Sequence, residues 1–524
     1  VCSSDLALIV NFVLYKIRVI HMKVLLNKVL KIYLKQRLPK IEEYKNFPHE
    51  VQQKVFSNLI KKAENTEWGR KYEFSTIRDV KTFQERLAVQ DYEQIKPYVE
   101  RMQKGENNLL WPSKIKWFSK SSGTTSDKSK FIPVSTEALH ECHYNGGKDA
   151  VALYYGCRPD ARLFTGKGLV LGGSHSISPF NGESSVGDVS GILIQNFPRW
   201  AEFARTPHRS VALMSEWDKK LDRIANATIH QNVTNLSGVP SWNLVLLKKI
   251  LEITGKSNIL EVWPNLELFF HGGISFAPYS QQFRKLIPSD RMWYMESYNA
   301  SEGFFGIQDT PHSDEMLLML DHGIFYEFIS MDELGNEHPR ALTLDQVEKG
   351  VNYALVISTN AGLWRYLIGD TVQFSSLKPY RIRISGRTRN FINAFGEEVI
   401  IDNAERALSA ACSGTGAIIS EYTAAPVFLE DNNSASHEYL IEFEVEPDSL
   451  DNFVSTLDKE LQQLNSDYEA KRSADIMLKK PKVKMLPRGT FYKWLKSKNR
   501  VGGQNKVPRL FNGRKYADEI LALI

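Results

Sequence analysis

Cysteine is scarce in this sequence. Four cysteines occur in 524 residues, and no two of them form a C-x-x-C pair or stand beside a histidine cluster. They are Cys2, Cys142, Cys157 and Cys412. This spacing argues against a disulfide framework and against a zinc site. Buried free thiols in a reducing compartment fit better, so we expect a cytoplasmic protein.

Long apolar runs are also missing. Residues 6–20 are mostly apolar, but Lys16 and Arg18 interrupt them, so the run is too short and too charged to span a membrane. It also lacks the charge order and the small residues of a secretory signal. Because the first methionine is Met22, we expect translation to start there and residues 1–21 to be a non-native or disordered extension.

The segment after Met22 has a mixed character. Apolar residues recur there at roughly helical spacing, with lysines between them. The lysines are Lys23, Lys28, Lys31 and Lys35. A basic amphipathic helix of this kind can lie on a membrane. We expect it instead to pack on its own domain.

Several common catalytic motifs are absent. The chain has no G-x-x-x-x-G-K-[ST] loop and no G-x-S-x-G elbow, which argues against a P-loop NTPase and an α/β-hydrolase. The formal net charge of +5 is small for this length and does not by itself indicate a nucleic-acid partner.

The length predicts two or more domains, because one ordinary core does not accommodate 524 residues. Apolar strand-like runs at 168–171, 266–270 and 353–357 stand between helical stretches such as 51–63 and 76–87. This alternation indicates an α/β domain. The pattern changes near residue 380, where shorter strands and helices follow, including a helix expected at 450–464. We expect a large domain over 22–380 and a small α+β domain over 381–524, with a hinge near 385–389.

The segment 479–515 is strongly basic. It holds thirteen lysines and arginines and no acidic residue. Such a segment can bind nucleic acid. Aromatic and proline residues divide it, however, and favour a folded surface or a cationic lid over a phosphate-bearing site.

The strongest local motif is the stretch 119–126, Ser-Lys-Ser-Ser-Gly-Thr-Thr-Ser. Small hydroxyl residues around a glycine suit a phosphate, because the backbone can approach closely and the hydroxyls add donors. Taken alone, such a stretch is a polar turn about as often as a phosphate site.

Three further stretches are weak singly. In 298–303 a tyrosine can stack on a base, and Glu302 can hold Mg²⁺. In 366–370 Asp370 can accept hydrogen bonds from a ribose diol, although a turn cap is the simpler interpretation. In 502–509 Lys506 can bring a point charge to a reacting carboxylate.

In this order, the four stretches together resemble the auxin-responsive acyl acid–amido synthetase family, a branch of the luciferase-type adenylate-forming enzymes. The likeness runs from about Met22 to the end of the chain and also includes 66–70, 130–133, 271–274 and 385–387. It implies a large N-terminal α/β adenylate-forming domain and a smaller mobile α+β C-terminal domain. It also implies ATP and Mg²⁺ as cofactors.

The resemblance carries residue roles to matching positions. The phosphate loop corresponds to Ser121, Ser122, Gly123, Thr124 and Thr125, and the nucleotide-binding set also includes Lys130, Gly273, Tyr298 on the adenine, Asp370 on the ribose and Arg387. Lys506 and Glu302 are the implied catalytic residues, with Glu302 also the metal ligand. This sequence has Ala300 where the family often has serine, and Leu367-Ile368 where it usually has Arg-Leu, which affects fine nucleotide contacts.

The implied reaction has two steps. A small carboxylic acid is activated as acyl-AMP with release of pyrophosphate, and the acyl group then passes to an amine, expected to be an amino acid, with release of AMP. One alternative is an acid–CoA ligase. Another is a nucleic-acid-binding protein that uses 479–515. We expect no nucleic-acid partner, no membrane span and a monomer.

Overall fold

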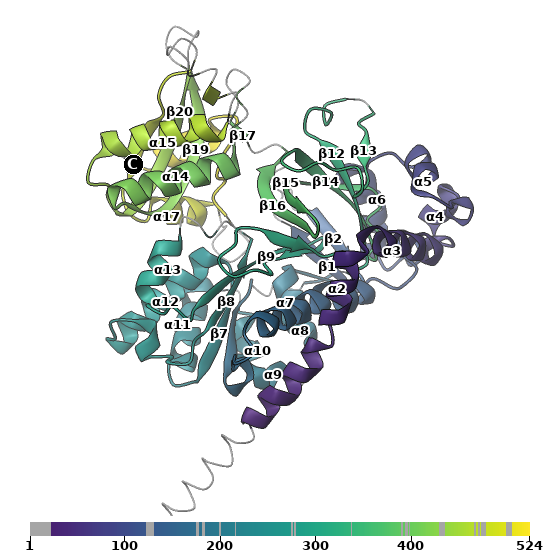
Figure 1. Ribbon diagram of the computed structural model, residues 1–524, viewed down its shortest axis with the longest axis horizontal. Coiled ribbons are helices and arrows are strands. Elements are labelled where there is room, and N and C mark those ends of the chain that lie inside the picture. Colours follow the sequence, from purple (N-terminus) through teal and green to yellow (C-terminus); the bar gives the residue numbers. More distant parts are fainter. Residues whose placement is uncertain are drawn as a thin grey trace, which may run out of the picture.

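The computed structural model describes most of the chain (Figure 1). The described residues are 23–121, 130–173, 178–180, 184–198, 201–214, 216–273, 276, 279–336, 338–388, 391–392, 397, 399–428, 435–465, 468–469, 472, 478–498 and 506–524. The predicted extension 1–21 therefore lies outside the description. No helix among these residues is long and apolar enough to cross a membrane.

The N-terminal part is helical, as its periodicity predicts. A helix over 23–35 is followed by α2 (Leu38–Asn46), α3 (Pro48–Ala63), α4 (Glu67–Lys71), α5 (Val80–Arg86) and α6 (Tyr92–Gln103). The helix predicted at 76–87 begins later than expected, at Val80. The reason is Asp79, whose side chain accepts a hydrogen bond from the backbone N–H of Thr82 and so caps the helix start.

A twelve-stranded mixed sheet organises the large body. In sheet order its strands are β13 (Ala341–Leu342), β12 (Ile324–Ser330), β14 (Asn352–Thr359), β15 (Tyr366–Leu377), β16 (Tyr380–Arg387), β11 (Met316–Leu318), β10 (Gly303–Ile307), β9 (Trp293–Ala300), β8 (Leu268–Gly272), β7 (Val233–Gly238), β3 (Lys167–Leu171) and β6 (Arg205–Thr206). The strands from β9 to β6 are parallel, whereas those from β13 to β9 are antiparallel.

Helices cover both faces of the parallel part, because parallel neighbours need crossover connections. These helices are α7 (Tyr144–Cys157), α8 (Val189–Asn196), α9 (Ala201–Ala204), α10 (Arg209–Ala212), α11 (Trp217–Thr228), α12 (Pro240–Thr254) and α13 (Ser280–Leu286). In Figure 1, α11, α12 and α13 lie on one side of β7 and β8, and α7, α8 and α10 lie on the other. Buried Leu236, Trp263 and Phe269 contribute to the core under α12.

A second sheet of four strands carries the serine–threonine motif. Its order is β2 (Lys130–Val134), β1 (Trp117–Ser121), β5 (Ser184–Gly187) and β4 (Ser178–Phe180). Strands β1 and β2 form an antiparallel hairpin in which Ser121 pairs with Lys130. The two residues that flank the predicted phosphate loop are therefore neighbours in this sheet.

The C-terminal body has its own core. Its elements are β17 (Phe391–Ile392), β18 (Val399–Ile400), α14 (Ile401–Thr415), β19 (Ile418–Phe428), β20 (Ala435–Val445), α15 (Leu450–Leu464), β21 (Lys482–Leu486), α17 (Thr490–Ser497) and α18 (Lys515–Leu521). Helices α14 and α15 pack on the sheet β19–β20–β21 through buried side chains such as Leu408, Tyr439 and Leu457. Ala435 and Ser436 are buried at the start of β20.

The expected boundary at 380/381 falls inside a strand. Residues Tyr380–Arg387 form β16, which pairs with β15 and β11 of the large sheet. The strand therefore lies with the N-terminal body through Arg387. The expected hinge at 385–389 begins within this strand, and its last residue lies outside the described residues. Its mobility stays a prediction.

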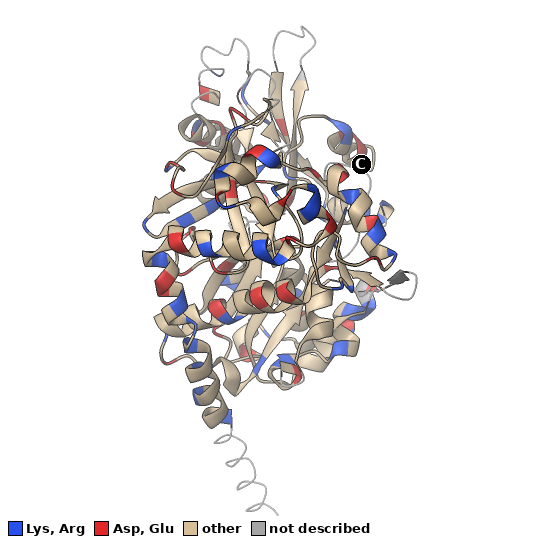
Figure 2. Ribbon diagram, turned by 90° about the vertical axis from the view of Figure 1, so that its right-hand side faces the viewer, with Lys and Arg blue, Asp and Glu red and all other residues tan. Residues whose placement is uncertain are grey.

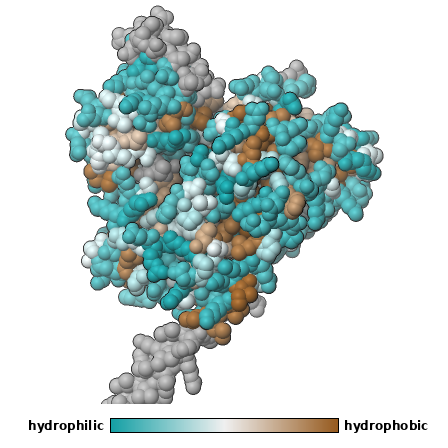
Figure 3. Space-filling view, viewed as in Figure 1, coloured by the Kyte–Doolittle hydropathy of each residue, from teal (hydrophilic) through white to brown (hydrophobic). Residues whose placement is uncertain are grey.

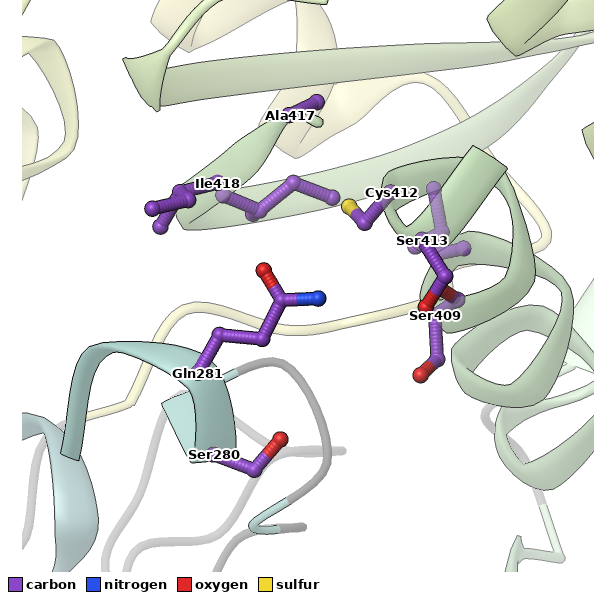
Figure 4. Close-up of a pocket in the computed structure, with 9 residues that line it drawn as sticks. Ser280, Gln281, Ser409, Cys412, Ser413, Ala417 and Ile418 are labelled. Carbon is purple, nitrogen blue, oxygen red and sulfur yellow. The ribbon is translucent and has the colours of Figure 1, made fainter. Parts of the chain in front are cut away.

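The two bodies meet through α12 and α13. The side-chain amide of Gln282 donates to the carbonyl oxygen of Ile419 over 3.0 Å, and Lys248 forms an ion pair with Glu444. Beside this contact, α13 and α14 enclose a cavity of about 90 Å³ (Figure 4). In Figure 4 the side chain of Gln281 points into it, opposite Cys412.

The described cysteines are free thiols. Cys142 and Cys412 are buried, as expected, whereas Cys157 is exposed. Burial raises the pKa of both buried thiols to about 12, so they stay protonated at neutral pH.

Candidate active site

The serine–threonine loop is anchored beside the second motif. The hydroxyl of Ser119 in β1 donates to the hydroxyl of Ser301 over 2.9 Å, and Ser301 stands in the turn between β9 and β10, directly before Glu302. The base of the phosphate loop and the predicted metal ligand are thus adjacent. Four of the predicted loop residues lie outside the described residues: Ser122, Gly123, Thr124 and Thr125. Ser121 is described as the last residue of β1.

A buried carboxylate joins the second and third motifs. The Tyr298 hydroxyl donates to Asp370 Oδ2 over 2.6 Å, and Arg387 Nε lies 2.9 Å from Asp370 Oδ1. Asp370 and Arg387 face each other across the antiparallel pair β15–β16, so the sheet register fixes this ion pair. Burial and the nearby Asp370 charge hold the pKa of Tyr298 well above its ordinary value, so its hydroxyl remains a donor. The Asp370 charge likewise raises the pKa of Arg387.

Glu302 belongs to the same group of charges. Burial, and next the Asp370 carboxylate, raise the pKa of Glu302 to about 7, while Arg387 and Lys130 oppose the shift. Two carboxylates in a desolvated place repel each other, and a bound cation relieves that repulsion. The chemistry of this position therefore fits a divalent cation that takes oxygen ligands, such as Mg²⁺.

Lys506 reaches this group from the C-terminal body. Its ammonium donates to the carbonyl oxygen of Gly273, which follows β8. Gly273 has φ of +82°, and a β-carbon built there would lie 3.1 Å from Lys506 Nζ, so a side chain at this position would crowd the ammonium. The residue as a whole is exposed, yet its ammonium end is desolvated. Burial, and next the Arg387 charge, lower the pKa of Lys506 to about 8, while the Asp370 charge opposes this shift.

The predicted residues that the structure describes therefore come together. Electrostatic interactions and hydrogen bonds connect residues from three parts of the chain: Lys506 from the small body, Lys130 from the hairpin, and Tyr298, Glu302, Asp370 and Arg387 from the large sheet. Gly273 contacts Lys506. The Tyr298 ring packs against Phe305, with 4.8 Å between the ring centroids. Its predicted stacking on adenine stays a prediction.

Known proteins match this chain along most of its length. Models of the GH3 family match its N-terminal domain at residues 37–292, its central domain at 317–387 and its C-terminal domain at 402–515. The chain belongs to the GH3 family. The predicted family resemblance is thereby confirmed.

Curated relatives of this GH3 protein are amido synthetases. It is 23% identical to indole-3-acetic acid-amido synthetase GH3.3 of Arabidopsis thaliana, over 90% of each chain. It is also 23% identical to indole-3-acetic acid-amido synthetase GH3.8 of Oryza sativa subsp. indica, again over 90% of each chain. These relatives do not favour the acid–CoA ligase alternative.

Solved structures share its fold. The GH3.15 acyl acid amido synthetase superposes with a TM-score of 0.76 at 16% identity, covering 93% of this chain and 96% of that one. A 2-hydroxyisobutyryl-CoA ligase in the postadenylation state gives 0.56 at 12% identity, covering 90% and 91%. The predicted fold, a large N-terminal α/β adenylate-forming domain with a smaller C-terminal domain, is confirmed.

In this GH3 chain a second residue of the C-terminal motif, Arg509, links the C-terminal body to the large body. Arg509 donates to the Tyr279 hydroxyl of the large body over 2.7 Å, contacts Glu421, and lies over the Tyr422 ring at 4.7 Å. The basic side chains of 479–515 are partly neutralised in the same way, for example in the ion pairs Lys498–Glu519 and Arg514–Glu438. The described parts of the segment, 479–498 and 506–515, are thus folded, as its aromatic residues predict.

Sequence reasoning missed some contacts of the site. His143 Nδ1 lies 3.0 Å from Asn299 Oδ1, which fixes the residue between Tyr298 and Ala300. His143 stands at the end of a π-helical turn over Ala138–His143, before α7. No motif marks His143, and Ser301 lies in the second motif without a predicted contact, because the partners of both lie more than 150 positions away in the sequence.

Proposed function

We propose that this GH3 protein is an ATP-dependent acyl acid–amido synthetase. The observation that carries the proposal is the meeting of Lys506, from the C-terminal body, with the Asp370–Arg387 pair and Glu302 of the large sheet. A site for a triphosphate and a carboxylate needs both fixed cations and groups for a metal and a ribose. All of these group types are present in this cluster.

In the first step a carboxylate oxygen of the acid attacks the α-phosphorus of ATP. The new bond is the mixed anhydride of the acyl group and AMP, the bond to the pyrophosphate oxygen breaks, and pyrophosphate leaves. Two anions must approach in line, so positioning and charge neutralisation supply most of the rate. Lys506 neutralises the approaching carboxylate, and the Ser121–Thr125 loop and Lys130 hold phosphate oxygens.

Asp370 holds the ribose hydroxyls, since an ionised carboxylate is an acceptor for both. Tyr298 and Arg387 orient this carboxylate through the two contacts described above. Glu302 holds Mg²⁺, which neutralises the triphosphate when it is bound. The raised pKa of Glu302, caused by burial and the neighbouring Asp370, supports a cation at this position.

In the second step an amine nitrogen attacks the acyl carbon, the bond to the AMP oxygen breaks, and AMP leaves. The amine loses its proton to solvent, so an amide and AMP are the products. Curated relatives named as indole-3-acetic acid-amido synthetases support an amine acceptor and a small carboxylic acid donor. The CoA-ligase neighbours share only the fold.

The acceptor is tested directly by product analysis. The protein is incubated with Mg–ATP, a panel of aryl, indolyl and aliphatic acids, and either amino acids or CoA, and products are identified by mass spectrometry. We expect an amide and one AMP per acid consumed. A thioester without amide, or ATP consumption that does not depend on any acid, contradicts the proposal.

A further inference from the structure

The helix over 23–35 exposes an unusual amount of apolar surface. Fifteen large hydrophobic side chains are exposed in the described part of the chain, and six of them lie in this helix. They are Val24, Leu25, Leu26, Val29, Ile32 and Tyr33, with exposed fractions between 42% and 68%. Figure 3 shows hydrophobic residues gathered at the end of the molecule where this helix leaves the body.

The opposite side of the helix is fixed to the large body. Asn27 donates to the carbonyl oxygen of Ala161 over 3.3 Å and accepts from the Tyr155 hydroxyl over 2.7 Å. Leu34, seven residues later and hence on the same face, is buried. Leu25, Val29 and Ile32 follow the i, i+4, i+7 spacing of a different face, so they point away from the body.

The chain just after the helix is anchored as well. Arg37 holds two carboxylates at once: its Nε lies 2.6 Å from Asp149, and its Nη2 lies 2.8 Å from Asp321. His322 adds a further contact to Asp149 over 3.0 Å. The helix is therefore held in one orientation, and its apolar face stays turned outward.

The charges on this helix and just after it have one sign. Residues 23–40 contain six lysines and arginines and no acidic residue. Lys28 and Lys35 lie four residues before and three residues after Ile32, so they flank the apolar face; Lys28 is exposed and Lys35 is partly exposed. Figure 2 draws the basic residues of this helix in blue. An apolar stripe flanked by lysines is the pattern of a helix that lies in a membrane interface and attracts anionic headgroups.

We propose that the 23–35 helix docks this protein on an anionic lipid surface. Leu25, Val29 and Ile32 enter the boundary between headgroups and acyl chains, while Lys28 and Lys35 face lipid phosphates. A second copy of the chain fits less well, because a symmetric pairing of this face brings lysines against lysines. The helix packs on its own domain through Asn27 and Leu34, as expected, and its apolar face is left for the membrane.

Vesicle flotation with the full chain tests this. We expect binding to phosphatidylcholine vesicles that contain about 30% phosphatidylserine, at least tenfold weaker binding to pure phosphatidylcholine, and a fall in binding as salt rises. The double variant Leu25→Glu with Ile32→Glu should bind at least tenfold less. The double variant Lys28→Glu with Lys35→Glu should lose the preference for phosphatidylserine. The matched control is Val445→Glu, an exposed hydrophobic position in the C-terminal body, which should bind like the unchanged chain.

The readouts separate membrane docking from its rivals. Acid-dependent pyrophosphate release without vesicles should be unchanged in every variant, which shows that each is folded. Absent binding to anionic vesicles, or equal loss in the Val445→Glu control, overturns the proposal. A dimer of the unchanged chain in sedimentation velocity that is lost only in the Leu25→Glu and Ile32→Glu variant also overturns the proposal, because a second copy then covers the apolar face.

Discussion

Replacing Lys506 with alanine removes the charge that the C-terminal body brings to the site. In the structure the ammonium bonds the Gly273 carbonyl and lies near Arg387 and Asp370. Its surroundings are desolvated, so its field acts at a low effective dielectric constant. A preorganised charge contact of this kind contributes about 3 kcal/mol to the transition state, or roughly 10²-fold in rate. We therefore expect Lys506→Ala to slow adenylation about 10²-fold.

The lowered pKa gives this prediction a second, quantitative part. With a pKa of about 8, Lys506 is about nine-tenths protonated at pH 7 and about one-tenth protonated at pH 9. Adenylation by the unchanged enzyme should thus fall about tenfold over this range. Lys506→Arg keeps its charge at both pH values and should show a flat profile, whatever its absolute rate.

The assay is acid-dependent pyrophosphate release without an amine, with ATP binding measured separately. ATP affinity should change little in Lys506→Ala, because its role is in the reaction step. Lys498→Ala is the matched control: it removes a lysine of the same basic segment that pairs with Glu519 instead. A normal release rate in Lys506→Ala, or an equal loss in Lys498→Ala, would refute the assignment.

Three further predictions follow from single contacts. Because burial and Asp370 raise the pKa of Glu302 to about 7, kcat/KM for Mg–ATP should rise with pH through about 7. Glu302→Gln should abolish this rise and raise the Mg²⁺ concentration that the enzyme needs. An unchanged pH profile in Glu302→Gln contradicts the metal role. Tyr298→Phe removes the hydrogen bond to Asp370 and should raise the KM for ATP about tenfold with a smaller change in kcat; an unaltered KM contradicts the ribose role of Asp370. Burial lowers the pKa of His143 to about 4, whereas in the unfolded chain its pKa is near 6.5. The stability that this difference contributes is present above pH 6.5 and is lost as the pH falls, with a loss of about 2 kcal/mol at pH 5. The free energy of unfolding of His143→Gln should therefore depend less on acid pH.

Elements with strong local signals were predictable from the sequence. The helix expected at 450–464 is α15 (Leu450–Leu464), whose apolar face and Ser449 cap are both visible in the sequence. The helix expected at 76–87 was placed too early, because periodicity alone does not locate a cap. The expected domain boundary falls inside β16, because a half-exposed strand has the same sequence pattern in either domain. Only its pairing with β15 shows to which domain the strand belongs.

The candidate site shows the same division. Motifs identified the charged residues, because each charge type suits one part of ATP. Their contacts were not predictable, since Tyr298 and Asp370 are 72 positions apart and Gly273 and Lys506 are 233 apart. Such contacts depend on sheet order and on how the two bodies dock. The 23–35 helix is a similar case: its period was visible, but which face packs depends on the partner surface.

The central claim is that these distant residues form one site that makes acyl-AMP. Exchange of labelled pyrophosphate into ATP measures this step alone, because it runs the first half-reaction in both directions without an acceptor. We expect exchange that requires Mg²⁺ and a suitable carboxylic acid, needs no amine, and is lost in Asp370→Asn. Tight ATP binding with no exchange for any acid of the panel, or exchange that persists without acid, would contradict the account.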